Sequence, residues 1–140
     1  MAEQQEEHAK VGVSVLVMNG DLVTQADIGA MLDYHERTGN RITIAAKQYS
    51  CVVPYGCITL EGDRVARFEE KPIISRWVNT GIYVVNPEVV KDVPSEMEFP
   101  ITCLLEKEVA AGGAVGAFEV SEDWLDVGQR EHLKQAREGI

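Results

Sequence analysis

The feature that most constrains this fold is a nearly unbroken apolar run, residues 11–18, that ends at Asn19-Gly20-Asp21. An apolar run of this length, rich in β-branched residues, is typical of a strand buried on both faces, as in a parallel sheet. The Asn-Gly pair then predicts a turn. We therefore expect an α/β domain built around a sheet, with Asp21 just beyond the carboxyl end of a strand.

The next segment has the pattern of an amphipathic helix. Thr24 and Asp27 fit a capping box, and apolar positions recur at helical spacing up to His35, which we interpret as a packed or half-exposed residue rather than a ligand. Gly39 is placed for a left-handed C-terminal cap. A second buried strand over residues 42–46 completes a strand–helix–strand unit with a right-handed crossover.

The pattern of the second half of the chain predicts a hairpin, a long strand, two helices, and then a last strand and a last helix. The hairpin would join Gly56–Glu61 to Arg64–Glu70 through a Gly62 turn. We expect a mixed sheet with flanking helices. The remaining elements are a strand at 77–85, a short helix after Asn86-Pro87, a helix at 100–111 with Ile101, Leu104, Leu105 and Val109 on one side, a strand at 114–120 and a closing helix at 129–138.

Composition limits the classes of function. The 140 residues fit one domain, residues 11–140, behind a polar leader of residues 1–10 that lacks the pattern of a secretory signal. A net charge of −10 argues against a nucleic-acid partner. No apolar run approaches the length of about 20 residues of a membrane span. Three cysteines without a CxxC motif favour reduced thiols and a cytoplasmic location.

Three charged residues are candidates for chemistry, although each has a simpler structural explanation. Asp21 could hold Mg²⁺ at a strand end, or be an ordinary turn residue. Asp126 could be a second metal ligand, or cap the closing helix. Lys71 could meet a phosphate, or form a surface ion pair with Glu69 or Glu70. Each residue alone predicts little.

The order of five short motifs predicts more than any one of them. These are Asn19-Gly20-Asp21, Pro54-Tyr55-Gly56, Glu70-Lys71-Pro72, Asn79-Thr80-Gly81-Ile82-Tyr83 and Trp124-Leu125-Asp126-Val127-Gly128. The series, over residues 13–136, resembles the sugar nucleotidyltransferases, closest to the glucose-1-phosphate and mannose-1-phosphate branches. These enzymes join a sugar 1-phosphate to a nucleoside triphosphate and release pyrophosphate. The resemblance implies their Rossmann-like nucleotide-diphospho-sugar-transferase fold.

The resemblance also implies a role for each matching residue. Asp21 and Asp126 match the aspartates that hold a catalytic Mg²⁺, and Lys71 matches the lysine that meets the sugar phosphate. Asp21 and Lys71 are thus the expected catalytic residues. A sugar 1-phosphate is the expected small-molecule partner, and its pocket would be lined, with Lys71, by Gly56, Glu70, Asn79 and Thr80.

One part of the family pattern is missing from these residues. The family carries a strand followed by a Gly-rich loop that cradles the triphosphate, and none of the twelve glycines here forms a G-x-G-x-x-G motif. We therefore expect a truncated domain that is inactive alone. Without the strands that would flank it, the strand ending at Met18 would expose an apolar edge. We expect a homodimer in which each chain covers the other's edge; the alternative is that the polar leader, residues 1–10, folds back over it.

Other functions remain open at this point. The chain could be half of an enzyme completed by another chain, or a structural or interaction module with a relic site. A phosphorelay receiver domain is excluded, because the first strand lacks an acidic pair and about half of the chain follows Lys71. A metal-dependent glycosyltransferase is harder to exclude, since Asn19-Gly20-Asp21 lies where those enzymes have an acidic motif.

Overall fold

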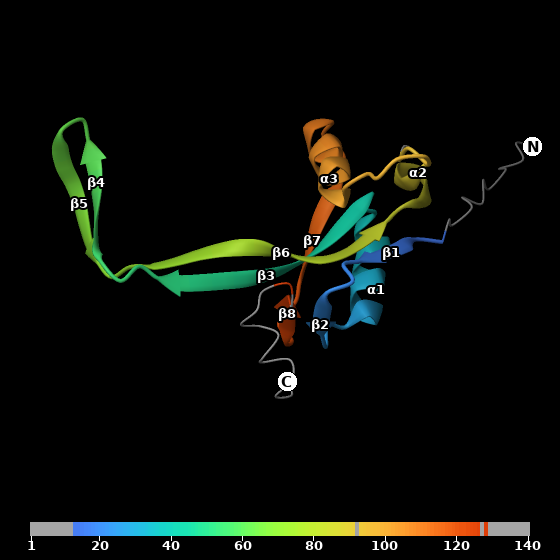
Figure 1. Ribbon diagram of the computed structural model, residues 1–140, viewed down its shortest axis with the longest axis horizontal. Coiled ribbons are helices and arrows are strands. Elements are labelled where there is room, and N and C mark those ends of the chain that lie inside the picture. The colour runs from blue at the N-terminus through green and yellow to red at the C-terminus, as the bar shows by residue number, and fades with distance from the viewer. Residues whose placement is uncertain (1–12, 92, 127, 129–140) are drawn as a thin grey trace, which may run out of the picture.

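The core of the molecule is a four-stranded mixed sheet in the order β1-β6-β3-β7 (Figure 1). The computed structural model describes residues 13–91, 93–126 and 128. Both β1 and β3 pair antiparallel with β6, whereas β7 pairs parallel to β3. The expected α/β class with a mixed sheet is confirmed, over the strands Val15–Met18 (β1), Ile73–Val85 (β6), Ile42–Val52 (β3) and Val115–Glu119 (β7).

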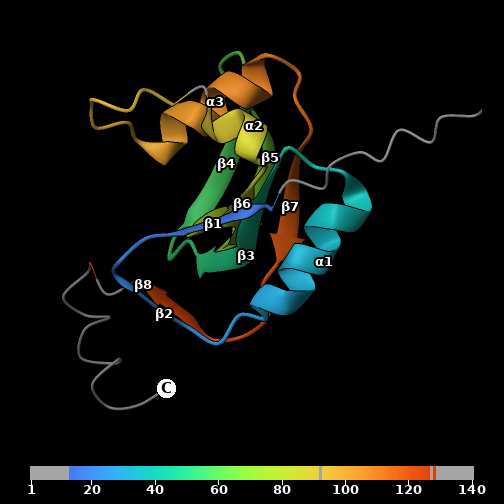
Figure 2. The same ribbon diagram turned by 90° about the vertical axis from the view of Figure 1, so that its right-hand side faces the viewer.

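Helices cover both faces of this sheet (Figure 2). On one face α1, Ile28–Thr38, packs Met31 against Ile82 and Val84 of β6. On the other face α2, Pro87–Val90, and α3, Ile101–Ala110, pack around Tyr83 and Val85. Because successive side chains of a strand point to opposite faces, the apolar run of β6 serves two cores at once.

The expectation that the first strand is buried on both faces is wrong. Val15, Leu16 and Met18 are 38%, 40% and 43% exposed. The reason is position: β1 lies at the end of the sheet, and within the described residues no strand pairs with its outer edge. It runs parallel to β3, as a strand–helix–strand unit requires, but β6 lies between them. The exposed apolar edge expected from the sequence is present.

The start of α1 also differs from the prediction. Thr24 belongs to β2, Leu22–Thr24, and its hydroxyl donates to the Asp123 carbonyl. Asp27 caps the helix instead, because its carboxylate accepts from the Ala30 N–H at 2.9 Å. The predicted C-terminal cap is confirmed: Gly39 has a φ of 64°, a left-handed conformation that glycine adopts without strain.

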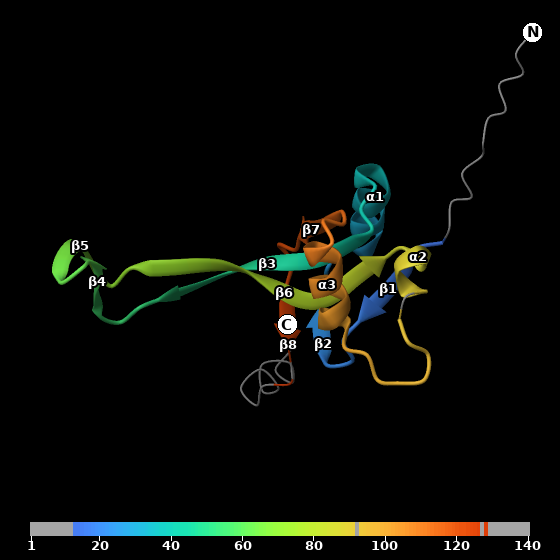
Figure 3. The ribbon, with the colours of Figure 1, turned by 90° about the horizontal axis from the view of Figure 1, so that it is seen from above.

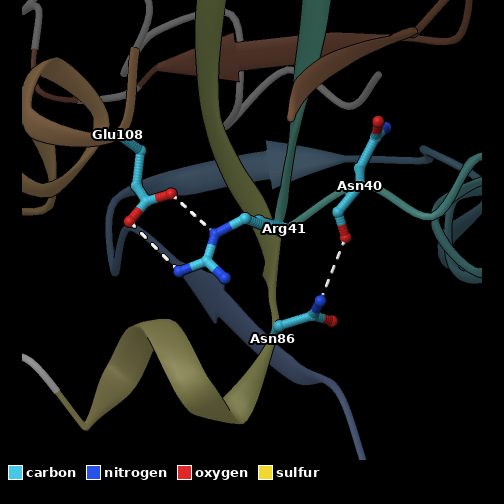
Figure 4. A network of polar contacts seen from close by, with 4 residues as sticks. All are labelled: Asn40, Arg41, Asn86 and Glu108. Atoms are coloured by element: carbon cyan, nitrogen blue, oxygen red, sulfur yellow. Dashed lines mark hydrogen bonds and ion pairs between the residues drawn. The ribbon is translucent and has the colours of Figure 1, made fainter. Parts of the chain in front are cut away.

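His35 is 2% exposed, so the packed one of its two expected positions is correct, and it belongs to a ring of four polar residues. Its Nδ1 lies 2.8 Å from the Thr43 hydroxyl and its Nε2 lies 2.9 Å from the Asn86 amide oxygen. The Asn86 side-chain amide donates to the backbone carbonyl of Asn40 (Figure 4). The Asn40 side-chain amide in turn donates to the Thr43 hydroxyl. Buried polar groups are tolerated when they are all paired, and this ring joins α1 to β3 and to Asn86, the residue that follows β6.

The helix α3 buries a carboxylate that lies outside its predicted apolar side. Leu104 and Leu105 of that side are buried, but Val109 is 61% exposed and Glu108 is 7% exposed. The Glu108 carboxylate accepts from the Arg41 guanidinium at 2.9 Å (Figure 4). This hydrogen bond, opposed by burial and aided by the charges of Arg41 and Lys107, lowers the pKa of Glu108.

Replacing Glu108 by glutamine should therefore destabilise the fold in a pH-dependent way. Because the folded-state pKa is lowered, the charged pair stabilises the protein above the unfolded-state pKa, and this stabilisation is lost as the pH falls through the folded value. We expect urea unfolding near pH 7 to show a loss of about 1–2 kcal/mol for Glu108→Gln. The difference from wild type should shrink below the lowered pKa. A difference independent of pH would contradict this explanation.

The strands β3 and β6 continue beyond the core as a two-stranded arm, residues 46–52 paired with 73–79 (Figures 1 and 3). The two strands are therefore longer than the predicted 42–46 and 77–85. The arm ends in the predicted hairpin of β4, Gly56–Glu61, and β5, Arg64–Glu70. The leader, residues 1–10, and the closing helix, 129–138, lie outside the described residues. Among the described helices, none is long and apolar enough to cross a membrane.

Candidate functional site

A second small sheet brings the two candidate metal ligands together. β2 pairs antiparallel with β8, Trp124–Asp126, and Leu22 lies opposite Asp126 (Figure 2). Asp21 immediately precedes Leu22, so the two aspartates lie at the same end of this ladder. They are 105 positions apart in the sequence and adjacent in the fold, as their shared motif series predicts.

The two carboxylates converge on Gly128. A Cβ atom built on Gly128 would lie 2.9 Å from an oxygen of Asp126 and 3.0 Å from an oxygen of Asp21. The backbone N–H of Gly128 also donates to the Asp126 carboxylate at 2.9 Å. A side chain at position 128 would occupy the space that both carboxylates face, so the glycine keeps this space open.

Two hydrogen bonds attach this carboxylate pair to the core strand β6. The N–H of Asn19 donates to the Gly81 carbonyl at 2.9 Å, which fixes the turn before Asp21. The indole N–H of Trp124 donates to the Thr80 carbonyl at 2.8 Å, which fixes the strand that carries Asp126. Residues Thr80 and Gly81 of β6 therefore hold both segments that carry the aspartates.

The side chains of Asn79 and Thr80 are engaged within the protein. The Asn79 amide donates to the Tyr83 hydroxyl and accepts from the Gly81 N–H. The Thr80 hydroxyl donates to the Ala45 carbonyl at 2.7 Å, and Thr80 is 1% exposed. In this structure their observed role is in these hydrogen bonds, and their sugar-binding role stays a prediction.

The other predicted substrate residues lie at the far end of the arm, away from the aspartates (Figure 1). Gly56 pairs with Glu70 across the hairpin, and Lys71 follows directly. A Cβ on Gly56 would lie 2.9 Å from the Phe68 ring and 3.2 Å from a Glu70 oxygen, so the glycine allows this close packing. Lys71 has a φ of 46°, and the only other positive values among the described residues belong to glycines.

The donor set at Asp21 and Asp126 suits a small, hard cation. Mg²⁺ is commonly held by one or two carboxylates, with water and phosphate oxygens completing its octahedron. Within residues 13–91, 93–126 and 128, no group of three or more His, Cys, Asp or Glu side chains gathers as a metal site. The two carboxylates therefore match the donor set that Mg²⁺ commonly uses.

Sequence reasoning did not assign roles to three residues that shape this site: Asn19, Gly81 and Gly128. The signal for Gly128 was its position two residues after Asp126, a spacing that lets a backbone N–H reach back to the carboxylate. The pairing of Asn19 with Gly81 has no local signal, because the two residues are 62 positions apart.

Comparison of this chain with known proteins identifies its family. The family model described as Nucleotidyl transferase matches residues 1–140. The chain belongs to the nucleotidyl transferase family. A relative from Danio rerio, the mannose-1-phosphate guanylyltransferase catalytic subunit beta, is 30% identical over 81% of this chain and 32% of its own length. A Synechocystis UTP--glucose-1-phosphate uridylyltransferase is 30% identical over 89% of this chain and 34% of its own length.

Solved structures give the same fold. HddC from Yersinia pseudotuberculosis aligns with a TM-score of 0.62 at 22% identity, over 89% of this chain and 54% of that chain. The expected Rossmann-like nucleotidyltransferase fold is thereby confirmed. The nucleotidyl transferase domain described here spans about a third of the length of the curated relatives it matches.

Proposed function

We propose that this chain carries the metal and sugar 1-phosphate part of a sugar nucleotidyltransferase site, centred on Asp21 and Asp126. The observation that supports it most is the convergence of both carboxylates on the open space at Gly128. The relatives named above are called a mannose-1-phosphate guanylyltransferase and a glucose-1-phosphate uridylyltransferase. A hexose 1-phosphate bound with Mg²⁺ is therefore the proposed ligand.

Each residue of the site has a defined task in this proposal. Asp21 and Asp126 would hold Mg²⁺, and the Gly128 N–H orients the Asp126 carboxylate. When bound, the ion would neutralise the negative oxygens of the phosphate groups. Lys71, Glu70 and Gly56 lie at the far end of the arm in this structure. Brought beside the aspartates, the Lys71 ammonium would add a positive point charge on the sugar phosphate, while Glu70 and the backbone at Gly56 would meet the sugar hydroxyls.

We also propose that the 140-residue chain forms no sugar nucleotide by itself. Its twelve glycines include no G-x-G-x-x-G loop, the element whose N–H groups would hold a triphosphate. Pyrophosphate release from a panel of triphosphates and sugar 1-phosphates should stay at background. Turnover that disappears in Asp21→Asn would overturn this part of the proposal.

A cytosolic location belongs to the same proposal. It is supported by three free cysteines, Cys51, Cys57 and Cys103.

The binding proposal is tested by calorimetric titration with mannose 1-phosphate or glucose 1-phosphate, with and without Mg²⁺. We expect binding only when Mg²⁺ is present, and at least about tenfold weaker binding in Asp21→Asn or Asp126→Asn. Asp123→Asn is the matched control, since it removes one exposed carboxylate next to β8 and should bind as wild type. Absence of binding in wild type, or equal loss in the control, would refute the proposal.

A further inference from the structure

The segment that carries Asp126 bends where it leaves the main sheet. At its start the Val120 N–H donates to the Ala46 carbonyl of β3 at 2.9 Å. The chain then bends at Glu122 and enters β8, which pairs with β2 in the second sheet (Figure 2). The position of Asp126 therefore depends on what holds residues 121–123 in this bend.

One side chain of β3, Lys47, holds the bend. Its ammonium donates to the Glu122 carbonyl at 2.6 Å and to the Ser121 carbonyl at 3.4 Å. Consecutive carbonyls of an extended strand point in opposite directions, so the approach of these two to one ammonium requires a bent backbone. A charged donor makes stronger hydrogen bonds than a neutral one. Without Lys47 the two carbonyls would lie close together and lose the donor that they share.

The small sheet that brings the aspartates together needs such attachments. β2 and β8 pair over only three residues each, and a two-stranded ribbon alone is at best marginally stable in water. The Asp123 carbonyl, at the entrance to β8, accepts from the Gln25 N–H at 3.0 Å and from the Thr24 hydroxyl at 3.2 Å. Lys47 holds the two carbonyls just before Asp123, so it fixes how β8 enters its ladder with β2.

We propose that Lys47 is a positioning residue for the metal site. By holding the bend at Ser121 and Glu122, it fixes Asp126 relative to Asp21 and favours a small cation over a larger one. The inference rests on the proposed function. Mg²⁺ requires a near-ideal octahedron with short bonds, whereas Ca²⁺ accepts longer and less regular coordination. A carboxylate pair with a loosened β8 should therefore lose Mg²⁺ more than Ca²⁺.

The effect on binding is tested by calorimetric titration of glucose 1-phosphate with Mg²⁺ and, separately, with Ca²⁺. Lys47→Met keeps an unbranched side chain and removes its charge and donors. We expect Mg²⁺-dependent binding to weaken about ten- to a hundredfold, as for partners that orient metal ligands, and Ca²⁺-dependent binding to weaken less. Lys47→Arg keeps N–H donors and should recover most of the Mg²⁺-dependent affinity. The control is Lys91→Met, at an exposed lysine after α2, which should bind as wild type.

Two results of this titration would overturn the proposal. One is unchanged Mg²⁺-dependent binding in Lys47→Met. The other is an equal loss for Mg²⁺ and Ca²⁺, because a general loss of folding weakens both alike, whereas a displaced carboxylate changes the preference between them.

Hydrogen exchange followed by NMR tests the positioning without any ligand. The Gln25 amide and the Trp124 indole N–H are donors in hydrogen bonds at the start of β8. In Lys47→Met both should exchange at least about tenfold faster than in wild type, while the amides of residues 82–85 in the core keep their rates. Equal acceleration everywhere, or none at Gln25 and Trp124, would overturn the proposal. If wild type binds no sugar 1-phosphate, the proposed function fails, and the exchange rates still decide whether Lys47 positions β8.

Discussion

Replacing Gly128 with alanine should abolish Mg²⁺-dependent sugar 1-phosphate binding while leaving the fold as stable as wild type. The new methyl group would lie 2.9 Å and 3.0 Å from oxygens of Asp126 and Asp21, so it would fill the space that an ion must enter. Both carboxylates and the Gly128 N–H remain, so the substitution removes only the space between the carboxylates. We expect at least about a hundredfold weaker binding, since a displaced ligand geometry is costly for Mg²⁺.

The matched control is Gly20→Ala, in the turn just before Asp21, where an added Cβ meets nothing within 4 Å. It should bind as wild type. Calorimetry and urea unfolding of both variants give the two readouts. If Gly128→Ala still binds normally, the ion does not lie between the two aspartates. If Gly128→Ala unfolds the protein, Gly128 is required for folding, and the loss of binding would then say nothing about the ion.

Replacing Gly81 with alanine should be among the most destabilising single changes in the core. Gly81 has a φ of 79°, where an alanine costs about 1–2 kcal/mol. The added Cβ would also lie 2.6 Å from the Asn19 side chain, and such overpacking costs a further 1–3 kcal/mol or so. We expect urea unfolding to show a total loss of about 2–5 kcal/mol, because both terms act on the link between β1 and β6.

Two further variants separate the two costs. Gly39→Ala has a φ of 64° with open space around its Cβ, so it should show the backbone cost alone. Asn19→Ala combined with Gly81→Ala should recover the overpacking cost and retain the backbone cost. A double variant no more stable than Gly81→Ala would show that the Asn19 side chain is not the obstacle.

Individual helices and turns of this fold could be predicted from the sequence because the residues that determine them are close together in the chain. The hairpin over 56–61 and 64–70 was predicted to the residue, since the Gly62 turn fixes its register. The end of α1 at Gly39 follows from the left-handed cap. The convergence of Asp21 and Asp126 was expected only through the ordered motifs, because no local pattern joins positions so far apart.

The differences from the sequence prediction come from tertiary context. An apolar run predicts a buried strand, but burial of β1 depends on which strands lie beside it. Thr24 has a side chain suited to a helix cap, yet its hydroxyl donates to the backbone carbonyl of Asp123, which is distant in sequence. The arm was not expected, because residues 46–52 and 73–79 read as ordinary strand and loop until their pairing is known.

The most direct test of the central claim, that Asp21 and Asp126 form one site, is a double-mutant cycle on Mg²⁺-dependent sugar 1-phosphate binding. Asp21→Asn, Asp126→Asn and the double variant are titrated under identical conditions. If the carboxylates hold one ion, either single change removes nearly all of the metal-dependent affinity, and the double variant is no weaker than the singles. Additive losses, or metal-dependent binding that persists in the double variant, would contradict the claim.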